Sequence, residues 1–301
     1  MKTLYGKLLF VLVLVIVIGV MNFQKAITLI QSYSLFRPQQ KEYTVKVQTQ
    51  TETLNVPLEE YLVGVVAGEM PVSFELEALK AQVVAARTFV MARNLSVDNT
   101  TASQVYLTTE QMQKNWGQNY QKNKEKIEKA VQQTSYEVMT YEGKYISALF
   151  FSSSNGKTVN CGDYFEGGQV YLQAVDSHWD LTIDPTNQRQ KTFTKQQITN
   201  AFNVSSPNLS ITSHTSSGYV KEVTINDKTF TGRQIREKLG LASSSFQIEL
   251  TSEGYLFTTR GSGHGVGMSQ YGAQGMAKEN KTYKDILHHY YQNVEIKRID
   301  S

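Results

Sequence analysis

Two helical apolar patterns between Pro57 and Asn94 constrain the fold of this chain more than any other stretch of its sequence. In the first, apolar side chains recur at the i, i+3, i+4, i+7, i+8 spacing that marks one face of a helix. These side chains are Leu58, Tyr61, Leu62, Val65 and Val66. Pro57 suits the first helical turn. Glu69 is the next member of the series, so the pattern predicts a carboxyl group on the apolar face of a helix.

A carboxyl group on an apolar face is unusual, because charged side chains are seldom buried unless they are paired or functional. Desolvation raises the pKa of such a group, and a glutamic acid that stays protonated near neutral pH can act as a general acid. The alternative is a structural carboxylate paired with a nearby cation, and the helix alone does not separate the two interpretations. The opposite face carries Gly64, Ala67 and Gly68, which are small enough to let another chain segment or a ligand approach closely.

The second pattern predicts a helix that begins with Ser73 as its N-cap. Its apolar stripe is formed by Leu76, Leu79, Val83, Ala86 and Val90. Lys80 and Arg87 are seven residues apart and fall on that same face. Both are candidates to hold Glu69, a substrate hydroxyl or an acetamido group. Alternatively, their stems pack against the core while their charged heads reach solvent.

The N-terminus predicts a membrane anchor. Residues 8–23 carry no charge and follow Lys2 and Lys7, which is the pattern of a membrane-directed segment with its basic flank in the cytoplasm. The residues that follow lack the small side chains of a cleavage site, which favours an uncleaved signal anchor over a cleaved signal peptide. We therefore expect a cytoplasmic stub and transmembrane anchor over residues 1–23, a linker over 24–41, and an extracytoplasmic domain over 42–299.

Composition limits the remaining possibilities. The chain has 301 residues and a net charge of only +3, which does not form a nucleic-acid-binding surface. Its single cysteine, Cys161, has no partner for an internal disulfide and is expected to be a small buried hydrophobe.

Beyond the two helices, the patterns mix strands and helices. Residues 42–57 predict a hairpin, residues 120–133 a solvated helix, and residues 136–151 two strands joined at Glu142-Gly143. Residues 191–260 predict short strands with one helix near 231–239. The chain ends in a glycine-rich loop, a helix and a closing strand. We expect an α+β fold in which a helical lobe and a β-rich lobe flank a substrate groove.

Two loops are rich in residues that suit carbohydrate binding. In "SSSNGK" (152–157), Ser153, Ser154 and Gly156 offer hydroxyls and free backbone groups, although an ordinary turn is the alternative. In "RGSGHGVGMSQYG" (260–272), His264 and Gly265 lie among alternating glycines that let the backbone pass close to a ligand. The glycines do not fit the dinucleotide pattern G-x-G-x-x-G.

Further candidates flank these loops. Ser269 can cap the following helix, Gln270 is a candidate for the substrate cleft, and His264 could orient Glu69 or serve a structural role. The aromatic candidates for stacking on sugar rings are Tyr171, Trp179 and Tyr271, although most such side chains belong to cores.

Several of these stretches together resemble the stage II sporulation protein D family of lytic transglycosylases. The first is "VPLEEYLVGVVAGEMPVSFELEALKAQVVAARTF", and "TASQVYL", "FFSSSNGKTVNC", "YLQAVDSHWD", "GSGHGVGMSQYGAQGMA" and "YKDILHHYYQNVEI" follow in the family's order. The resemblance covers about residues 42–299. It implies that Glu69 is the catalytic acid, and it makes Ser153, Ser154 and Gly156 plausible site residues.

The resemblance also bears on metals. Some relatives place a histidine and cysteines around the serine-rich loop as zinc ligands, whereas here position 151 is Phe and Cys161 stands alone. Structural zinc needs four closely spaced ligands. We therefore expect neither zinc nor another cofactor.

The implied activity is cleavage of the bond between N-acetylmuramic acid and N-acetylglucosamine in peptidoglycan, leaving 1,6-anhydro ends. The implied context is septal wall degradation during forespore engulfment at the cell membrane, with stage II sporulation proteins P and M as partners. Two alternatives stay open. A muramidase would need a second carboxylate, for which Asp176 and Asp180 are candidates. A non-catalytic activator of an amidase would bind the wall and need no acid at position 69.

Overall fold

The computed structural model describes residues 42–49, 51–100 and 103–299. The predicted anchor (1–23) and linker (24–41) lie outside these residues. Within the described ranges, no helix is both long and apolar enough to cross a membrane. Residues 43–299 form one compact unit.

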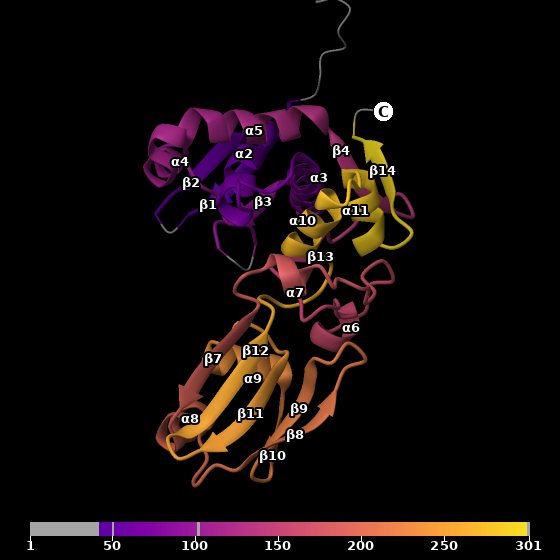
Figure 1. The fold of residues 1–301 in the computed structure, drawn as a ribbon. Coiled ribbons are helices and arrows are strands. Elements are labelled where there is room, and N and C mark those ends of the chain that lie inside the picture. The colour runs from indigo at the N-terminus through magenta and orange to yellow at the C-terminus, as the bar shows by residue number, and fades with distance from the viewer. Residues whose placement is uncertain (1–41, 50, 101–102, 300–301) are drawn as a thin grey trace, which may run out of the picture. The chain divides into compact units, whose positions relative to one another are not determined.

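Helices occur together with mostly antiparallel strands, which confirms the α+β class (Figure 1). The helices are α2 (Leu58–Glu69), α3 (Leu76–Ala92), α4 (Thr109–Trp116), the 3-10 turn η1 (Gly117–Asn119), α5 (Tyr120–Gln133), α6 (Cys161–Tyr164), α7 (Asp180–Ile183), α8 (Lys195–Phe202), α9 (Gly232–Leu239), α10 (Gln270–Lys278) and α11 (Tyr283–Tyr290). The strands are β1 (Thr44–Gln48), β2 (Thr53–Pro57), β3 (Ser96–Asp98), β4 (Glu137–Tyr141), β5 (Lys144–Tyr145), β6 (Phe150–Phe151), β7 (Gln188–Phe193), β8 (Leu209–His214), β9 (Val220–Ile225), β10 (Lys228–Thr231), β11 (Phe246–Thr251), β12 (Gly254–Arg260), β13 (Met268–Ser269) and β14 (Glu295–Arg298).

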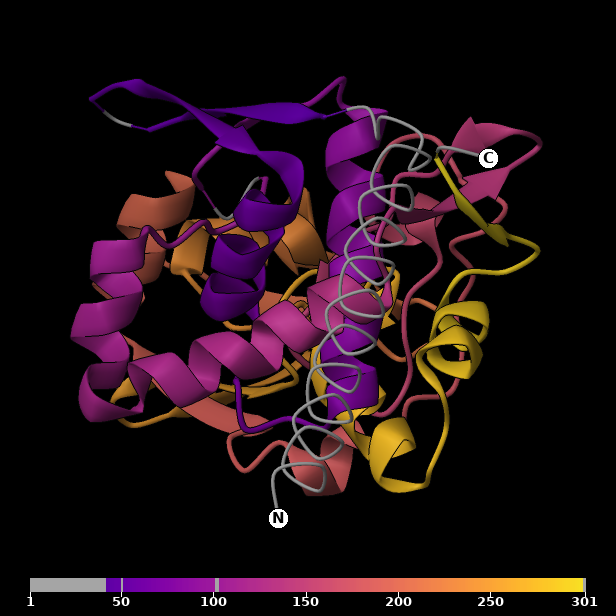
Figure 2. The same ribbon diagram turned by 90° about the horizontal axis from the view of Figure 1, so that it is seen from above.

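Helix α3 is the centre of the first of two hydrophobic cores. It is buried along most of its length and packs against α2, α5, α10, α11 and β4. In the view from above, the magenta helix α5 crosses the purple α3 (Figure 2). The sheet β2-β1-β3 and the sheet β14-β4-β5 complete this part of the fold. An apolar helix of this kind is stable because neighbours cover it on several sides.

The second core lies within residues 193–257. It is built by two antiparallel sheets, β11-β12-β7 and β10-β9-β8, together with α8 and α9. Ile198, Ile235 and Phe257 are completely buried in it. The short strands β6 and β13, which precede and follow this segment in the sequence, pair in parallel with each other.

Most local predictions agree with these elements. The hairpin is β1-β2, the solvated helix is α5, and the two strands joined at Glu142-Gly143 are β4 and β5. Ser269 caps α10 by accepting a hydrogen bond from the Gly272 amide.

Two local predictions were wrong. The second helix begins at Leu76 rather than after Ser73, because residues 71–74 form a turn closed by the Phe74 amide on the Pro71 carbonyl. The segment 191–260 contains a second helix, α8, in addition to α9. The missed signal was its capping box, in which Thr194 and Gln197 bond each other's backbone.

Candidate active site

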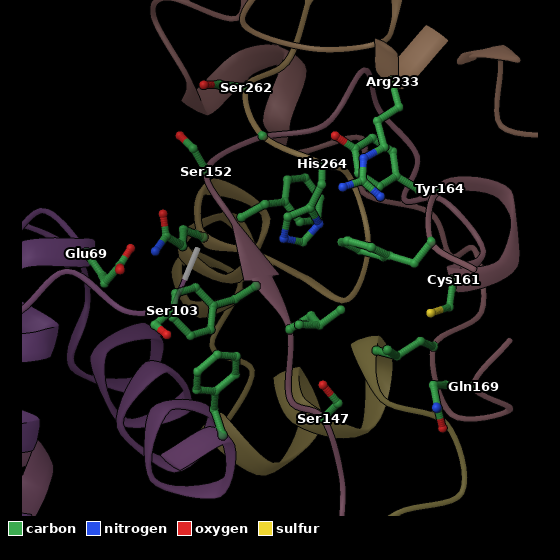
Figure 3. Close-up of a pocket in the computed structure, with 18 of the residues that line it drawn as sticks. Glu69, Ser103, Ser147, Ser152, Cys161, Tyr164, Gln169, Arg233, Ser262 and His264 are labelled. Carbon is green, nitrogen blue, oxygen red and sulfur yellow. The ribbon is translucent and has the colours of Figure 1, made fainter. Parts of the chain in front are cut away.

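A cavity of about 950 Å³ contains Glu69, His264 and Gln270 in its lining. These side chains come from the end of α2, the glycine-rich loop and the start of α10. In the view of Figure 3, Glu69 lies to the left of His264, with Arg233 and Tyr164 to its right. The cavity is therefore lined both by residues next to the first core and by residues of α9, which belongs to the second core.

Glu69 is half-buried at the last position of α2. Its Oε1 accepts a hydrogen bond of 2.6 Å from the Val105 amide. Burial raises the pKa of the carboxyl group, and the hydrogen bond from the Val105 amide, together with the neighbouring Gln270 side chain, opposes that rise. Among the described residues Glu69 forms no ion pair, so the interpretation as a salt-bridged structural carboxylate lacks its cation.

Close packing on the small face of α2 sets this geometry. A Cβ atom at Gly68 would lie 2.6 Å from the Val105 carbonyl oxygen, and one at Gly64 would lie 2.4 Å from the Tyr106 ring. Only glycine allows the segment at Val105 and Tyr106 to approach so closely. The predicted close approach to Gly64 and Gly68 is thus made by another segment of the chain.

Gln270 is the first residue of α10 and is 5% exposed. Its Nε2 is buried and meets no hydrogen-bond acceptor among the described residues. A buried amide group without a partner is costly, and its position in the cavity lining makes it available to a ligand oxygen.

His264 lies among aromatic rings, in contact with Phe151, Tyr164 and Phe165. Its Nδ1 accepts a hydrogen bond from the Val266 amide, which requires that nitrogen to be unprotonated. Burial, together with the nearby positive charge of Arg236, lowers the pKa of His264 to about 4. The ring is therefore neutral at physiological pH.

Comparisons of the sequence with known proteins identify its family. The family model "Stage II sporulation protein" matches residues 46–141, which contain Glu69. Stage II sporulation protein D of Bacillus subtilis is 44% identical over 262 residues, which cover 82% of this chain and 76% of that protein. The chain belongs to the stage II sporulation protein D family.

Two further proteins are similar to this chain. Stage II sporulation protein D of Bacillus amyloliquefaciens is also 44% identical over 262 residues, with the same shares of both chains covered. The amidase enhancer of Bacillus subtilis is 29% identical over 292 residues, which cover 76% of this chain and 39% of that protein.

Lys80 and Arg87 do not reach the candidate site of this sporulation protein D family member. Lys80 pairs with Glu77 and lies over the Tyr283 ring. Arg87 is completely buried, binds Glu59 through two parallel hydrogen bonds of 2.9 and 2.6 Å, and also donates to two backbone carbonyls. Neither side chain contacts Glu69, and neither lines the cavity.

The serine-rich loop is held by hydrogen bonds to other residues of the chain. Ser153 donates to Asp184, and Ser154 donates to Asp180 through both its hydroxyl and its amide. Gly156 has a positive φ of 103° and donates its amide to the Ser154 hydroxyl. None of the three lines the cavity, whereas their neighbour Ser152 does.

The remaining candidates from the sequence differ in their contacts and in whether they line the cavity. Tyr171 is buried, and its hydroxyl accepts from the Ser147 amide. Gly265 packs against Val159 and Tyr219. Trp179 donates to Glu279 and Tyr271 meets Phe74 edge-on, and neither residue is in the cavity lining. Cys161 is buried and contributes to the lining.

Neither candidate for a second catalytic carboxylate lines the cavity with Glu69. Asp176 is exposed and pairs with His178. Asp180 is completely buried and accepts hydrogen bonds from Ser154, Ser177 and Ser269. The carboxylates that share the lining with Glu69 are Glu166 and Glu237, both of them exposed.

The arginines of α9 were missed by sequence reasoning. Arg233 and Arg236 line the cavity one helical turn apart. Their i, i+3 spacing in "GRQIREKL" was the available signal, since it places both on one face of the helix. Among the described residues there is no group of three or more His, Cys, Asp or Glu side chains placed to hold a metal ion.

Proposed function

We propose that this chain is a lytic transglycosylase that cleaves peptidoglycan glycan strands, with Glu69 as its single acid and base. The observation that carries this proposal is the environment of Glu69. The side chain is half-buried in the lining of a large cavity, its pKa is raised, and it has no ion-pair partner among the residues that the structure describes. A neutral carboxylic acid is the form that can donate a proton to a glycosidic oxygen.

The proposed reaction needs one carboxyl group in two successive states. The Val105 amide occupies Oε1, so Oε2 is the oxygen that carries the proton. That proton passes to the bridging oxygen as the glycosidic bond breaks. The resulting carboxylate then takes the proton of the muramic acid O6 hydroxyl, whose oxygen attacks C1 and closes a 1,6-anhydro ring without consuming water. Gln270 and His264 would bind the sugar beside the acid, as hydrogen-bonding groups in the same lining.

The wider role is proposed from family membership. We propose that the domain 42–299 works outside the cytoplasm, anchored by residues 1–23, with the cavity as a groove between the helical and the β-rich parts. Its role would be thinning of the septal wall during engulfment, together with stage II sporulation proteins P and M. The name of the family and of its relatives supports a sporulation context.

Product analysis tests the activity. Glycan strands are treated with the full chain, either unaltered or as Glu69→Gln, and the products are weighed by mass spectrometry. We expect fragments one water lighter than reducing-end products, and a loss of at least about a hundredfold in rate for the variant. Glu60→Gln is the matched control, because Glu60 is an exposed glutamate of the same helix.

The two alternatives predict other results. Fragments with ordinary reducing ends that also disappear in Glu166→Gln would identify a two-carboxylate muramidase, since Glu166 shares the cavity lining. Intact strands that stay bound to both proteins would instead favour a wall-binding activator, the function suggested by the related amidase enhancer.

A further inference from the structure

Arg236 is a half-buried cation in the cavity lining that forms no ion pair with any residue that the structure describes. Its Nε donates to the Ala242 carbonyl at 3.2 Å, and its Nη1 donates to the Tyr164 hydroxyl at 2.9 Å. Both acceptors are neutral. Within the described residues Arg236 has no carboxylate at ion-pair distance, whereas its neighbour Arg233 is paired with Glu237 at 2.8 Å.

The two bonds use only two of the five N–H groups of the guanidinium. The remaining donors have no protein acceptor among the described residues. A partly buried charge without a partner is unfavourable, and a fixed planar fork of donors matches the two oxygens of a carboxylate or a phosphate.

The positive field of Arg236 extends into the cavity. The nearby guanidinium contributes to the lowered pKa of His264, a residue of the same lining. An anion bound between these side chains would therefore meet a positive potential and a neutral imidazole. Glu237 is paired with Arg233, but Glu166 lies in the same lining and would oppose a doubly charged group such as phosphate more than a singly charged carboxylate.

We propose that Arg236 binds a carboxylate carried by the glycan strand, and so forms an anion subsite in the same cavity as Glu69. This inference rests on the proposed function for the kind of strand. A muramic acid residue offers this chemistry in two ways, as a free lactyl carboxylate or as the carboxylates of a peptide attached through the lactyl group. Tyr164 holds the guanidinium in place, and Arg233, neutralised by Glu237, packs against the Tyr164 and Phe165 rings.

Binding of uncleaved strands tests the subsite. The full chain carrying Glu69→Gln is titrated with three labelled strands of equal length. One has free lactyl carboxylates, one retains its peptides, and one has every carboxyl group converted to a methylamide. We expect Arg236→Gln to weaken binding of a carboxylate strand about tenfold or more and to leave the methylamide strand unaffected. The carboxylate strand whose binding is weakened by Arg236→Gln identifies the source of the bound group.

Three variants control for charge and packing. Lys238→Gln removes the same charge from an exposed position of the same helix, and Tyr164→Phe removes a hydrogen bond while keeping the guanidinium. Lys238→Gln should bind as tightly as the parent. Tyr164→Phe should bind with an affinity between those of the parent and Arg236→Gln, because Tyr164 positions the guanidinium. Arg236→Lys should recover part of the affinity. Equal affinity of the parent for carboxylate and methylamide strands would overturn the proposal, as would equal losses in Lys238→Gln and Arg236→Gln. This binding assay needs no cleavage. If a strand binds through Arg236 but the unaltered chain never cuts it, the proposed activity is refuted and the proposed subsite is not.

Discussion

At the scale of single residues, burial shifts the pKa values of two cavity side chains in opposite directions, and the consequence for their charge is the same. It raises the pKa of Glu69 and lowers that of His264, and in both cases the neutral form is favoured. The hydrogen bond from the Val266 amide reinforces this for His264, because a protonated Nδ1 could not accept it. The cavity therefore places a carboxyl group with a raised pKa in the same lining as a neutral imidazole.

The free energy of unfolding should depend on the titration of His264. Its pKa falls from 6.5 to about 4 on folding, so the unfolded chain binds the proton first as pH decreases. Stability contributed by the neutral ring is fully present above pH 6.5 and is lost as pH falls through about 4, by at most about 3 kcal/mol. Denaturant titrations at pH 7.5 and 4.5 should show a smaller difference for His264→Gln than for the unaltered chain. An equal reduction of this difference between pH 7.5 and 4.5 in His214→Gln, a substitution at an exposed histidine, would contradict the assignment to His264.

At the scale of elements, the position of Glu69 depends on how closely another segment approaches α2. The Val105 carbonyl occupies the space where a Cβ atom of Gly68 would be, and the Val105 amide holds Glu69. In an isolated helix, alanine is favoured over glycine by up to about 1 kcal/mol. Here the steric conflict with rigid backbone outweighs that preference.

Gly68→Ala should therefore destabilise the chain by about 1–3 kcal/mol, despite the gain in helix propensity. It should also reduce cleavage, because the displaced Val105 amide no longer fixes the Glu69 carboxyl. Thermal unfolding and product formation are the two measurements. Gly168→Ala is the control, since a Cβ atom there meets nothing within 4 Å. Unchanged stability in Gly68→Ala would show that the segment at Val105 yields easily.

At the scale of the whole molecule, Asp180 connects segments that are distant in sequence. It accepts hydrogen bonds from Ser154 in the serine-rich loop, from Ser177 just before α7, and from Ser269 at the N-cap of α10. Gln270 directly follows Ser269. The position of this cavity residue is therefore tied to a buried carboxylate that does not itself line the cavity.

Asp180→Asn should lower the free energy of unfolding by about 2–4 kcal/mol, because an amide nitrogen would replace an acceptor for buried donors. Asp176→Asn, at an exposed position, should have little effect. Thermal melts and cleavage rates measured together separate the two roles considered for Asp180. A catalytic carboxylate would lose rate without losing stability, and that outcome would revive the muramidase.

Local patterns predicted the elements well, and the partners of side chains poorly. The stripe of α2 and the caps depend on neighbours within a few residues, so the sequence is informative about them. The prediction that Lys80 and Arg87 lie on the buried face of their helix was also correct. The residues that they bind were not predictable from that face. Arg87 binds Glu59, twenty-eight positions earlier in the chain. The arginines of α9 reach the cavity only through tertiary packing, which periodicity does not encode.

The segment of the second core leaves and re-enters the rest of the fold at one point. Asn187 directly precedes β7, Gly261 directly follows β12, and the Gly261 amide donates to the Asn187 carbonyl at 2.8 Å. A segment whose two ends touch can be lengthened, shortened or exchanged between relatives without straining the chain on either side of it. Evolution could therefore redesign the wall of the cavity that carries Arg236 while the residues around Glu69 stayed as they are.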